Sequence, residues 1–156
     1  MTAALWRIAS VTMGWSADDM RGIGAEASGG RWNPVGMAVV YASETIALAL
    51  HETVVHLRAA GLPLNRYLVR IEVPDAVWNA RQILDAPPPG WDAQPYGTPS
   101  VLAGEAWLKA ASSALLAVPS VIVPEERNVL INPAHPDAGR LRAAIVRRWQ
   151  YDPRFF

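Results

Sequence analysis

The feature that most constrains this chain is its division into short apolar runs, each bounded by glycine, proline or polar turn residues. Such runs have the length of strands, which typically contain about five or six residues. Only 44–60 and 103–112 have helical character, with one further helical turn expected at 138–141. Several strands with two main helices predict an α+β fold. The expected strands cover 5–9, 38–42, 67–73, 114–118 and 128–132, and 143–151 fits either a strand or a helix, with the strand favoured.

Length and composition restrict the classes of protein to which the chain can belong. Its 156 residues fit a single domain over 1–156. A hydrophobic content of 51% excludes a disordered chain. The 14 basic and 14 acidic residues cancel, which argues against direct binding of nucleic acid. The chain has neither an apolar run of ~18 residues nor a signal-peptide pattern, so we expect no membrane association and a cytoplasmic location.

Several kinds of catalytic site are also excluded. The chain has no cysteine, so it has no thiolate nucleophile or thiolate metal ligand. Its three histidines, His51, His56 and His135, are too scattered to predict a metal site. No Gly-x-Ser-x-Gly elbow, phosphate-binding loop or Gly-x-Gly-x-x-Gly fingerprint occurs. We therefore expect chemistry without metal, thiol or Rossmann-type cofactor binding.

The helix expected at 44–60 is apolar on two sides, which is typical of a helix that is buried twice or lines a pocket. Leu48 and Val55 lie nearly opposite the main apolar stripe, and Glu52 lies beside them. Two interpretations are open. Glu52 is either a carboxylate at the rim of a cleft or half of a surface pair with His56, one turn further along. The main stripe contains Ile46, Leu50, Thr53, Val54 and Leu57.

The segment 29–36 is a turn-rich stretch in which Arg31 directly follows two glycines. Glycine allows the backbone to approach a ligand closely, and an arginine held by a tight turn suits a phosphate group. The alternative is an ordinary turn with a solvated Arg31 and a packed Trp32. A second irregular stretch runs from 87 to about 99 and is long enough to be functional or mobile.

Taken in order, several short motifs resemble the RES domain family, which is named for an arginine, a glutamate and a serine. Those residues look like Arg31, Glu52 and Ser120 here. The resemblance covers nearly the whole chain. The motifs are Gly-Gly-Arg-Trp-Asn-Pro-x-Gly at 29–36, Tyr-Ala-Ser-Glu-Thr at 41–45, Val-Pro-Ser at 118–120, Asn-Val-Leu-Ile-Asn-Pro at 128–133 and Asp-Pro-Arg at 152–154.

The resemblance implies a fold similar to that of ADP-ribosyltransferases, in which small mixed β-sheets with flanking helices form a cleft. It implies a toxin of a type II toxin–antitoxin system with NAD⁺ as its substrate and no metal. One expected activity is the transfer of ADP-ribose to an acceptor such as the protein phosphoribosyl pyrophosphate synthetase. The alternative is an NAD⁺ glycohydrolase or phosphorylase that uses water or phosphate. The implied partner is an Xre-like, helix-turn-helix antitoxin of the MbcA/ParS type.

The resemblance also assigns candidate roles to individual residues. Glu52 is the candidate to stabilise the oxocarbenium-like centre that forms when the nicotinamide–ribose bond breaks. Arg31 is the candidate for binding the pyrophosphate, and Tyr41 for packing against the cationic nicotinamide ring. We expect these three residues to be catalytic. The further candidates for NAD⁺ binding are Ser43, Ser120, Asn128 and Arg7.

Overall fold

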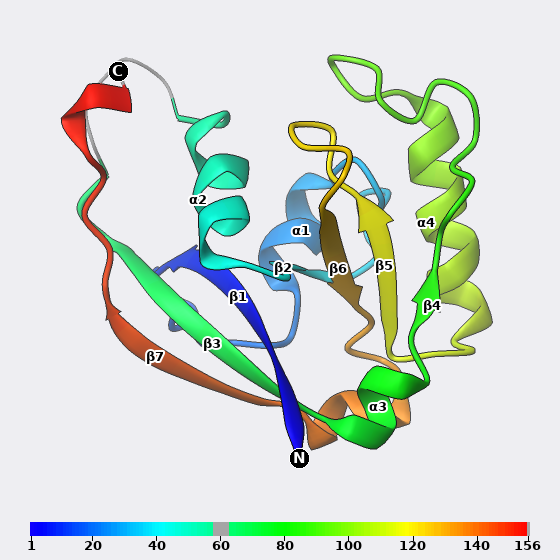
Figure 1. Cartoon of the computed structure of the whole chain (residues 1–156), viewed down its shortest axis with the longest axis horizontal. Coiled ribbons are helices and arrows are strands. Elements are labelled where there is room, and N and C mark those ends of the chain that lie inside the picture. Colours follow the sequence, from blue (N-terminus) through cyan, green and yellow to red (C-terminus); the bar gives the residue numbers. More distant parts are fainter. Residues whose placement is uncertain (58–62, 156) are drawn as a thin grey trace.

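The computed structural model describes residues 1–57 and 63–155. Its strands form one sheet in the order β4-β5-β6-β2-β1-β3-β7, with helices packed on both sides (Figure 1). Neighbouring strands are antiparallel except for the pair β4 and β5. The elements are β1 (Thr2–Ser10), α1 (Ile23–Ser28), β2 (Val40–Ser43), α2 (Ile46–Val54), β3 (Arg66–Pro74), α3 (Asp75–Asn79), β4 (Gln82–Ile83), α4 (Thr98–Ala110), β5 (Leu115–Pro119), β6 (Arg127–Ile131), η1 (Pro136–Arg140), β7 (Arg142–Arg148) and η2 (Pro153–Phe155).

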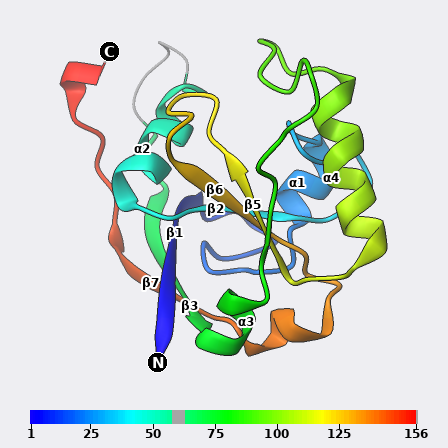
Figure 2. The ribbon, with the colours of Figure 1, turned by 45° about the vertical axis from the view of Figure 1, so that its right-hand side comes forward.

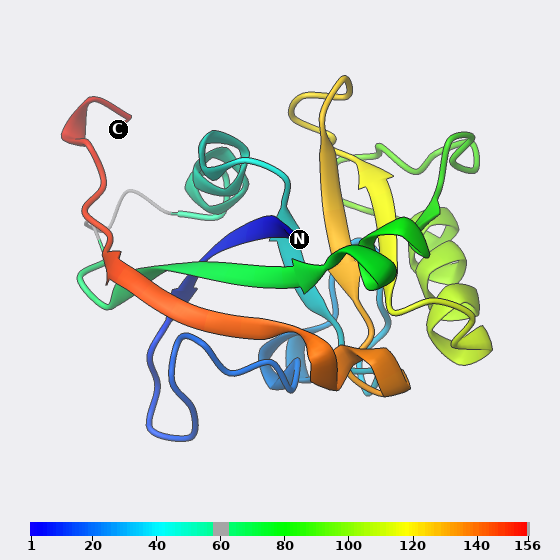
Figure 3. The same cartoon turned by 60° about the horizontal axis from the view of Figure 1, so that its bottom comes forward.

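The sheet consists of two halves that join at a single residue pair. Strand β1 pairs with β3 along its whole length, but it pairs with β2 only where Trp6 lies opposite Ser43. The half β1-β3-β7 therefore runs in a different direction from the half β4-β5-β6-β2 (Figure 3). The α+β prediction is confirmed, and the small sheets that we expected are connected at this one point into a continuous sheet.

The predicted strands are all present, because each apolar run is interrupted by residues that favour turns. The segment 143–151 is a strand, as favoured, although β7 ends at Arg148. Four short elements were not predicted, namely α1, α3, β4 and η2, since none is long enough to show a clear periodicity. No helix in the described part of the chain has the length and apolar character needed to cross a membrane.

Helix α2 begins after Thr45, whose Oγ1 accepts a hydrogen bond from the amide of Leu48 at 3.1 Å. This is an N-cap interaction, and it explains why the helix starts slightly later than predicted. The helix ends at Val54, and 58–60 of the prediction lie outside the described residues. The main apolar stripe packs as predicted, against a cluster formed by Ile8, Leu68, Trp149 and Tyr151.

Helix α4 begins at Thr98, five residues before the predicted start, with Pro99 in its first turn, where proline is well tolerated. The helix lies against the part of the sheet that contains β5 and β6 (Figure 2). Its buried residues Trp107 and Leu108 pack with Leu116 of β5 and Leu130 of β6. Gly104 of the helix lies directly against the backbone carbonyl of Trp32, and a Cβ at this position would overlap that oxygen. The turn that carries Arg31 and Trp32 is therefore supported from behind by α4.

This contact predicts that Gly104→Ala destabilises the protein, although alanine usually favours a helix over glycine. We expect the free energy of unfolding to fall by about 1–3 kcal/mol, because the added methyl group forces the helix away from the turn. Gly24→Ala in α1 is the matched control, since a Cβ at Gly24 would meet no atom within 4 Å. Urea unfolding of both variants measures the difference, and equal stabilities would contradict the prediction.

Candidate active site

A large pocket of about 1050 Å³ opens where the two halves of the sheet meet. Its walls come from β1, α1, β2 and α2, together with the turn at 30–32 and residues 121–122 that follow β5. Six of the seven predicted site residues line it: Arg7, Arg31, Tyr41, Ser43, Glu52 and Asn128. The structure thus brings together residues from five separate elements, namely β1, the turn at 30–32, β2, α2 and β6.

Glu52 projects from the half-buried side of α2 and is held by two hydrogen bonds. Ser120 Oγ donates to Glu52 Oε1 at 2.7 Å, and Asn128 Nδ2 donates to the same oxygen at 2.6 Å. Hydrogen bonds to an ionised carboxylate are stronger than those between neutral groups. Across residues 1–57 and 63–155, no side chain donates to the second oxygen, Oε2. The carboxylate is therefore fixed in place with one oxygen available to a ligand.

Of the two interpretations of Glu52, the cleft is correct and the surface pair with His56 is wrong. Both residues line the pocket, but His56 is exposed and the carboxylate bonds across the fold to Ser120 and Asn128. These partners lie 68 and 76 residues away in the sequence. Helical spacing can predict the face on which Glu52 lies, but it carries no information about such distant partners.

Ser120 does not line the pocket, and its side chain is fully buried. Its hydroxyl oxygen accepts hydrogen bonds from the amides of Ile122 and Val123, at 3.1 and 3.2 Å. With its acceptor capacity used by these amides, the hydroxyl donates its proton to Glu52. The geometry of Ser120 therefore suits a residue that orients the carboxylate.

Asn128 and Ser43 extend this network to the centre of the sheet. Ser43 Oγ donates to Asn128 Oδ1 at 2.7 Å, which orients the amide so that its nitrogen faces Glu52. The two residues lie directly opposite each other on β2 and β6. Ser43 is also the residue at which the two halves of the sheet are joined. Both line the pocket, so they are placed to contact a ligand as well as to hold Glu52.

Arg31 occupies the tip of the turn from Gly30 to Asn33, where it is partly buried. Its Nη1 donates to the backbone carbonyls of Trp91 and Ala93, at 2.8 and 2.9 Å. Burial lowers the pKa of the Arg31 guanidinium, and the negative charge of Glu52 opposes this shift. The alternative of a solvated Arg31 is wrong, because one edge of the guanidinium holds the loop around Trp91 against the pocket.

Tyr41 lies on β2 and contributes its ring to the pocket wall. The phenol donates to Asn33 Oδ1 at 2.6 Å and accepts from the Trp32 amide at 3.1 Å. Burial raises the pKa of the Tyr41 phenol well above its ordinary value. The hydroxyl therefore stays protonated and occupied by the turn, and the ring is the part of the side chain that can pack against a ligand.

Arg7 lies on β1 at the pocket wall, and its Nε is shielded from solvent without a hydrogen-bond partner in the described structure. Burial lowers the pKa of the Arg7 guanidinium, and the nearby Asp19 carboxylate partly opposes the effect. Asp19 is itself paired with Arg21. A buried cation without a full set of partners is costly, which makes Arg7 well suited to an anionic ligand.

Tyr96 and Trp6 are among the pocket residues that the sequence analysis did not propose for the site. Tyr96 belongs to the irregular stretch 87–99, and the Arg31 guanidinium lies over its ring, 6.0 Å from the ring centroid. The length of that stretch was the available signal, but it could not identify the residue. Trp6 precedes Arg7 on β1 and was interpreted only as a strand residue.

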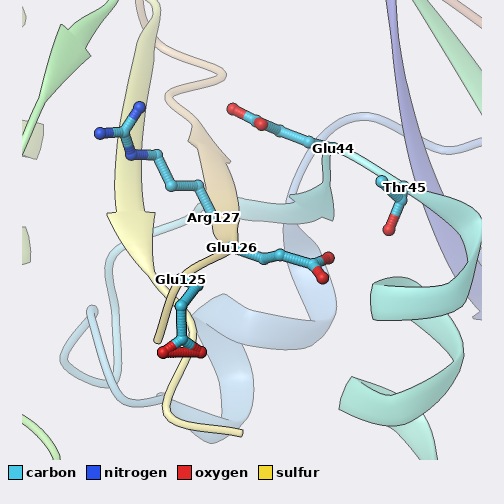
Figure 4. Close-up of a pocket in the computed structure, with 5 residues that line it drawn as sticks. All are labelled: Glu44, Thr45, Glu125, Glu126 and Arg127. Carbon is cyan, nitrogen blue, oxygen red and sulfur yellow. The ribbon is translucent and has the colours of Figure 1, made fainter. Parts of the chain in front are cut away.

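A smaller hollow of about 350 Å³ lies beside the start of α2 and has an acidic character (Figure 4). It is lined by Glu44, Thr45, Glu125, Glu126 and Arg127. Arg127 reaches Asp85 at 3.4 Å. In the parts of the chain that the structure describes, no group of three or more histidine, aspartate or glutamate side chains is arranged to hold a metal ion.

Comparisons with known proteins agree with the motifs in the sequence. A chain from Sphingobium sp. (strain YBL2), named "Prs ADP-ribosylating toxin", is 56% identical over 156 residues, which cover 99% of this chain and 97% of that protein. "Toxin Res" of Pseudomonas putida is 40% identical over 136 residues, covering 86% and 87% of the two chains. "Toxin Res" of Yersinia enterocolitica is 37% identical over 151 residues, covering 96% and 97%.

A solved structure supports the fold independently. A chain in the crystal structure of the M. tuberculosis MbcT-MbcA toxin-antitoxin complex superposes with a TM-score of 0.64, covering 94% of this chain and 85% of that one. Its sequence identity is 17%, so the likeness concerns the fold alone. The sequence model described as "RES domain" matches residues 4–153. This match and the nearly full-length relatives lead to one conclusion: the chain belongs to the RES domain family.

Proposed function

We propose that this protein is a toxin that cleaves NAD⁺ at the nicotinamide–ribose bond and transfers the ADP-ribose to an acceptor. The observation that carries the proposal is Glu52, a carboxylate fixed by two hydrogen bonds in a large pocket that Arg7, Arg31 and Tyr41 also line. Relatives of nearly the same length are named as toxins, and one of them as ADP-ribosylating. We assign the catalytic roles to Glu52, Arg31 and Tyr41.

The reaction breaks the bond between C1′ of the ribose and the nicotinamide nitrogen, and the bonding electrons leave with a neutral nicotinamide. The ribose then carries positive charge, as in glycoside hydrolysis. A carboxylate that is already oriented stabilises this charge without reorganising, and Oε2 of Glu52 is available for the task. The acceptor forms the new bond to C1′ and releases its proton to solvent or to the carboxylate.

The remaining residues of the pocket suit the other parts of NAD⁺. The pyrophosphate requires cations, which Arg7 and the free edge of Arg31 supply. The cationic nicotinamide ring packs favourably on an aromatic face, and the Tyr41 ring offers one. We expect Ser43 and Asn128, which line the pocket, to bind ribose hydroxyls. NAD⁺ is thus a substrate, and the mechanism requires no metal.

For the acceptor, we propose a protein such as phosphoribosyl pyrophosphate synthetase. Support comes from the Sphingobium relative, which is named "Prs ADP-ribosylating toxin". Water or phosphate as the acceptor is the alternative, because it would use the same pocket. The partner that we propose is an Xre-like, helix-turn-helix antitoxin, supported by the toxin-antitoxin complex among the structures of similar fold. A toxin neutralised in this way would act in the cytoplasm.

The role of Glu52 predicts that Glu52→Gln lowers kcat for nicotinamide release by about 100-fold or more, as the loss of a preorganised electrostatic group does. KM for NAD⁺ should change much less, because the shape of the side chain is retained. Nicotinamide release measured by chromatography gives both constants. Glu105→Gln, which removes a carboxylate paired with Lys109 on α4, is the control. A fully active Glu52→Gln enzyme would overturn the proposal.

The burial of Arg7 predicts a defect in binding. Arg7→Gln should raise KM for NAD⁺ by about 10- to 100-fold, the equivalent of one charge-assisted hydrogen bond of about 1.5–3 kcal/mol. Because Arg7 contacts no reacting atom in this scheme, kcat should stay within a few-fold. Arg70→Gln on the adjacent strand β3, outside the pocket, is the matched control. Initial rates over a range of NAD⁺ concentrations give KM and kcat for both variants. Equal KM values for Arg7→Gln and Arg70→Gln would contradict the prediction.

The acceptor is identified by incubating the protein with biotinylated NAD⁺ in a bacterial lysate. We expect a discrete labelled band, and we expect purified phosphoribosyl pyrophosphate synthetase to be labelled in the same way. With the Glu52→Gln variant, neither the lysate protein nor the purified synthetase should be labelled. Rapid loss of NAD⁺ without a labelled protein would instead favour water or phosphate as the acceptor.

A further inference from the structure

We propose that Asn33 is a positioning residue. Its side-chain amide sets the place of the Tyr41 ring in the pocket, and its amide and backbone together hold the turn that carries Arg31. The inference rests on the proposed function, because it concerns how the NAD⁺ site is held in shape. Asn33 itself does not line the pocket, so it acts through its neighbours. It is the asparagine of the Gly-Gly-Arg-Trp-Asn-Pro motif.

The hydrogen bonds of Asn33 show how tightly it is held. The side chain is 1% exposed. Its Nδ2 donates to three backbone carbonyls, of Ala25 at 2.9 Å, Met37 at 3.0 Å and Pro34 at 3.2 Å. Helix α1, which precedes the turn, and the segment 34–37, which follows it, are therefore tied to one amide group. Its remaining polar atom, Oδ1, accepts the short hydrogen bond from the Tyr41 hydroxyl.

The bond to Tyr41 fixes the position of the ring. The phenol receives the amide proton of Trp32 and gives its own proton to Asn33, so both of its hydrogen-bonding directions are determined by the turn. A free tyrosine on β2 could rotate about its side-chain bonds, but this one is anchored at its far end. The ring face that the pocket presents is thus set by Asn33 and not by β2 alone.

The same residue closes the turn that carries Arg31. Asn33 and Gly30 exchange backbone hydrogen bonds of 3.0 and 3.3 Å, which leaves Arg31 and Trp32 at the tip. A Cβ at Gly30 would lie 2.8 Å from the Tyr41 hydroxyl and 2.9 Å from Asn33 Oδ1, so the site of this bond requires glycine. The glycine, the asparagine and the tyrosine therefore form one interlocked unit behind Arg31.

The test compares affinities for NAD⁺ in a Glu52→Gln background, in which turnover does not interfere. Isothermal titration calorimetry with NAD⁺ gives Kd for the background protein and for Asn33→Ala, Tyr41→Phe and the double variant. Asn132→Ala is the matched control, because Asn132 is also buried and also bonds two backbone groups, but lies outside the pocket. Thermal unfolding of each variant is measured in parallel.

We expect Asn33→Ala to raise Kd by about tenfold or more, since small displacements of binding groups have large effects. Tyr41→Phe, which keeps the ring, should raise Kd several-fold, and the double variant should be no weaker than Asn33→Ala, because the two residues act through one bond. In the Glu52-intact protein, both single variants should raise KM far more than they lower kcat.

Asn132→Ala should lower the melting temperature and leave Kd for NAD⁺ unchanged from the background protein. The inference is overturned if Asn33→Ala gives this same result. The inference is also overturned if the increase in Kd of the double variant equals the product of the increases caused by Asn33→Ala and Tyr41→Phe alone. Should Asn33→Ala not fold, Tyr41→Phe decides: unchanged KM, or a loss of kcat alone, contradicts the positioning role. A wild-type protein that does not consume NAD⁺ would instead refute the proposed function, so the two failures are distinguishable.

Discussion

The interaction on which the rest of the site depends is the pair of hydrogen bonds that Ser120 and Asn128 donate to one oxygen of Glu52. Hydrogen bonds to a charged group contribute about 1.5–3 kcal/mol each, and a half-buried carboxylate without them would be costly. The bonds join α2 to β6 and to the end of β5, and Ser43 extends them to β2. They converge where the sheet halves meet at a single pair, Trp6 with Ser43. The join in the sheet and the position of the carboxylate therefore depend on the same few residues.

The opposite wall of the pocket is built on a different principle. Irregular backbone forms it, and such backbone must find partners for its polar groups. Asn33 supplies these partners to the turn, and Arg31 supplies them to the loop at 91–93. Helix α4 closes the unit from behind, because Gly104 allows it to lie against the Trp32 carbonyl. One wall of the pocket thus depends on regular strands and a capped helix, and the other on side chains that satisfy a loop.

Much of this arrangement could be predicted from the sequence, because it follows from local patterns. The strands follow from apolar runs, and the buried stripe of α2 follows from helical spacing. Helical spacing left the cleft position of Glu52 as one of two interpretations, and the pocket in the structure decided between them. The partners of Glu52 could not be predicted in this way, since Ser120 and Asn128 come near it only after the strands pair. We expected Ser120 to contact NAD⁺, and whether it does stays a prediction, but its hydroxyl is turned toward Glu52. The role of Asn33 was missed because an asparagine beside a proline ordinarily indicates only a turn.

The distribution of charge around the pocket agrees with the proposed substrate. NAD⁺ carries a cationic nicotinamide ring at one end of a ribose and an anionic pyrophosphate at the other. The pocket is lined by two carboxylates, Glu52 on α2 and Asp19, and by three arginines, Arg7 on β1, Arg31 on the turn and Arg66 on β3. Burial lowers the pKa of Arg7 and Arg31. Glu52 also opposes the lowering of the Arg31 pKa, so the opposite charges favour each other before any ligand binds. As nicotinamide leaves, positive charge moves from its ring to the ribose, and a carboxylate held at this point stabilises the transition state more than the bound substrate. A carboxylate free to rotate would lose part of that advantage, which is why its fixation by Ser120 and Asn128 matters as much as its charge.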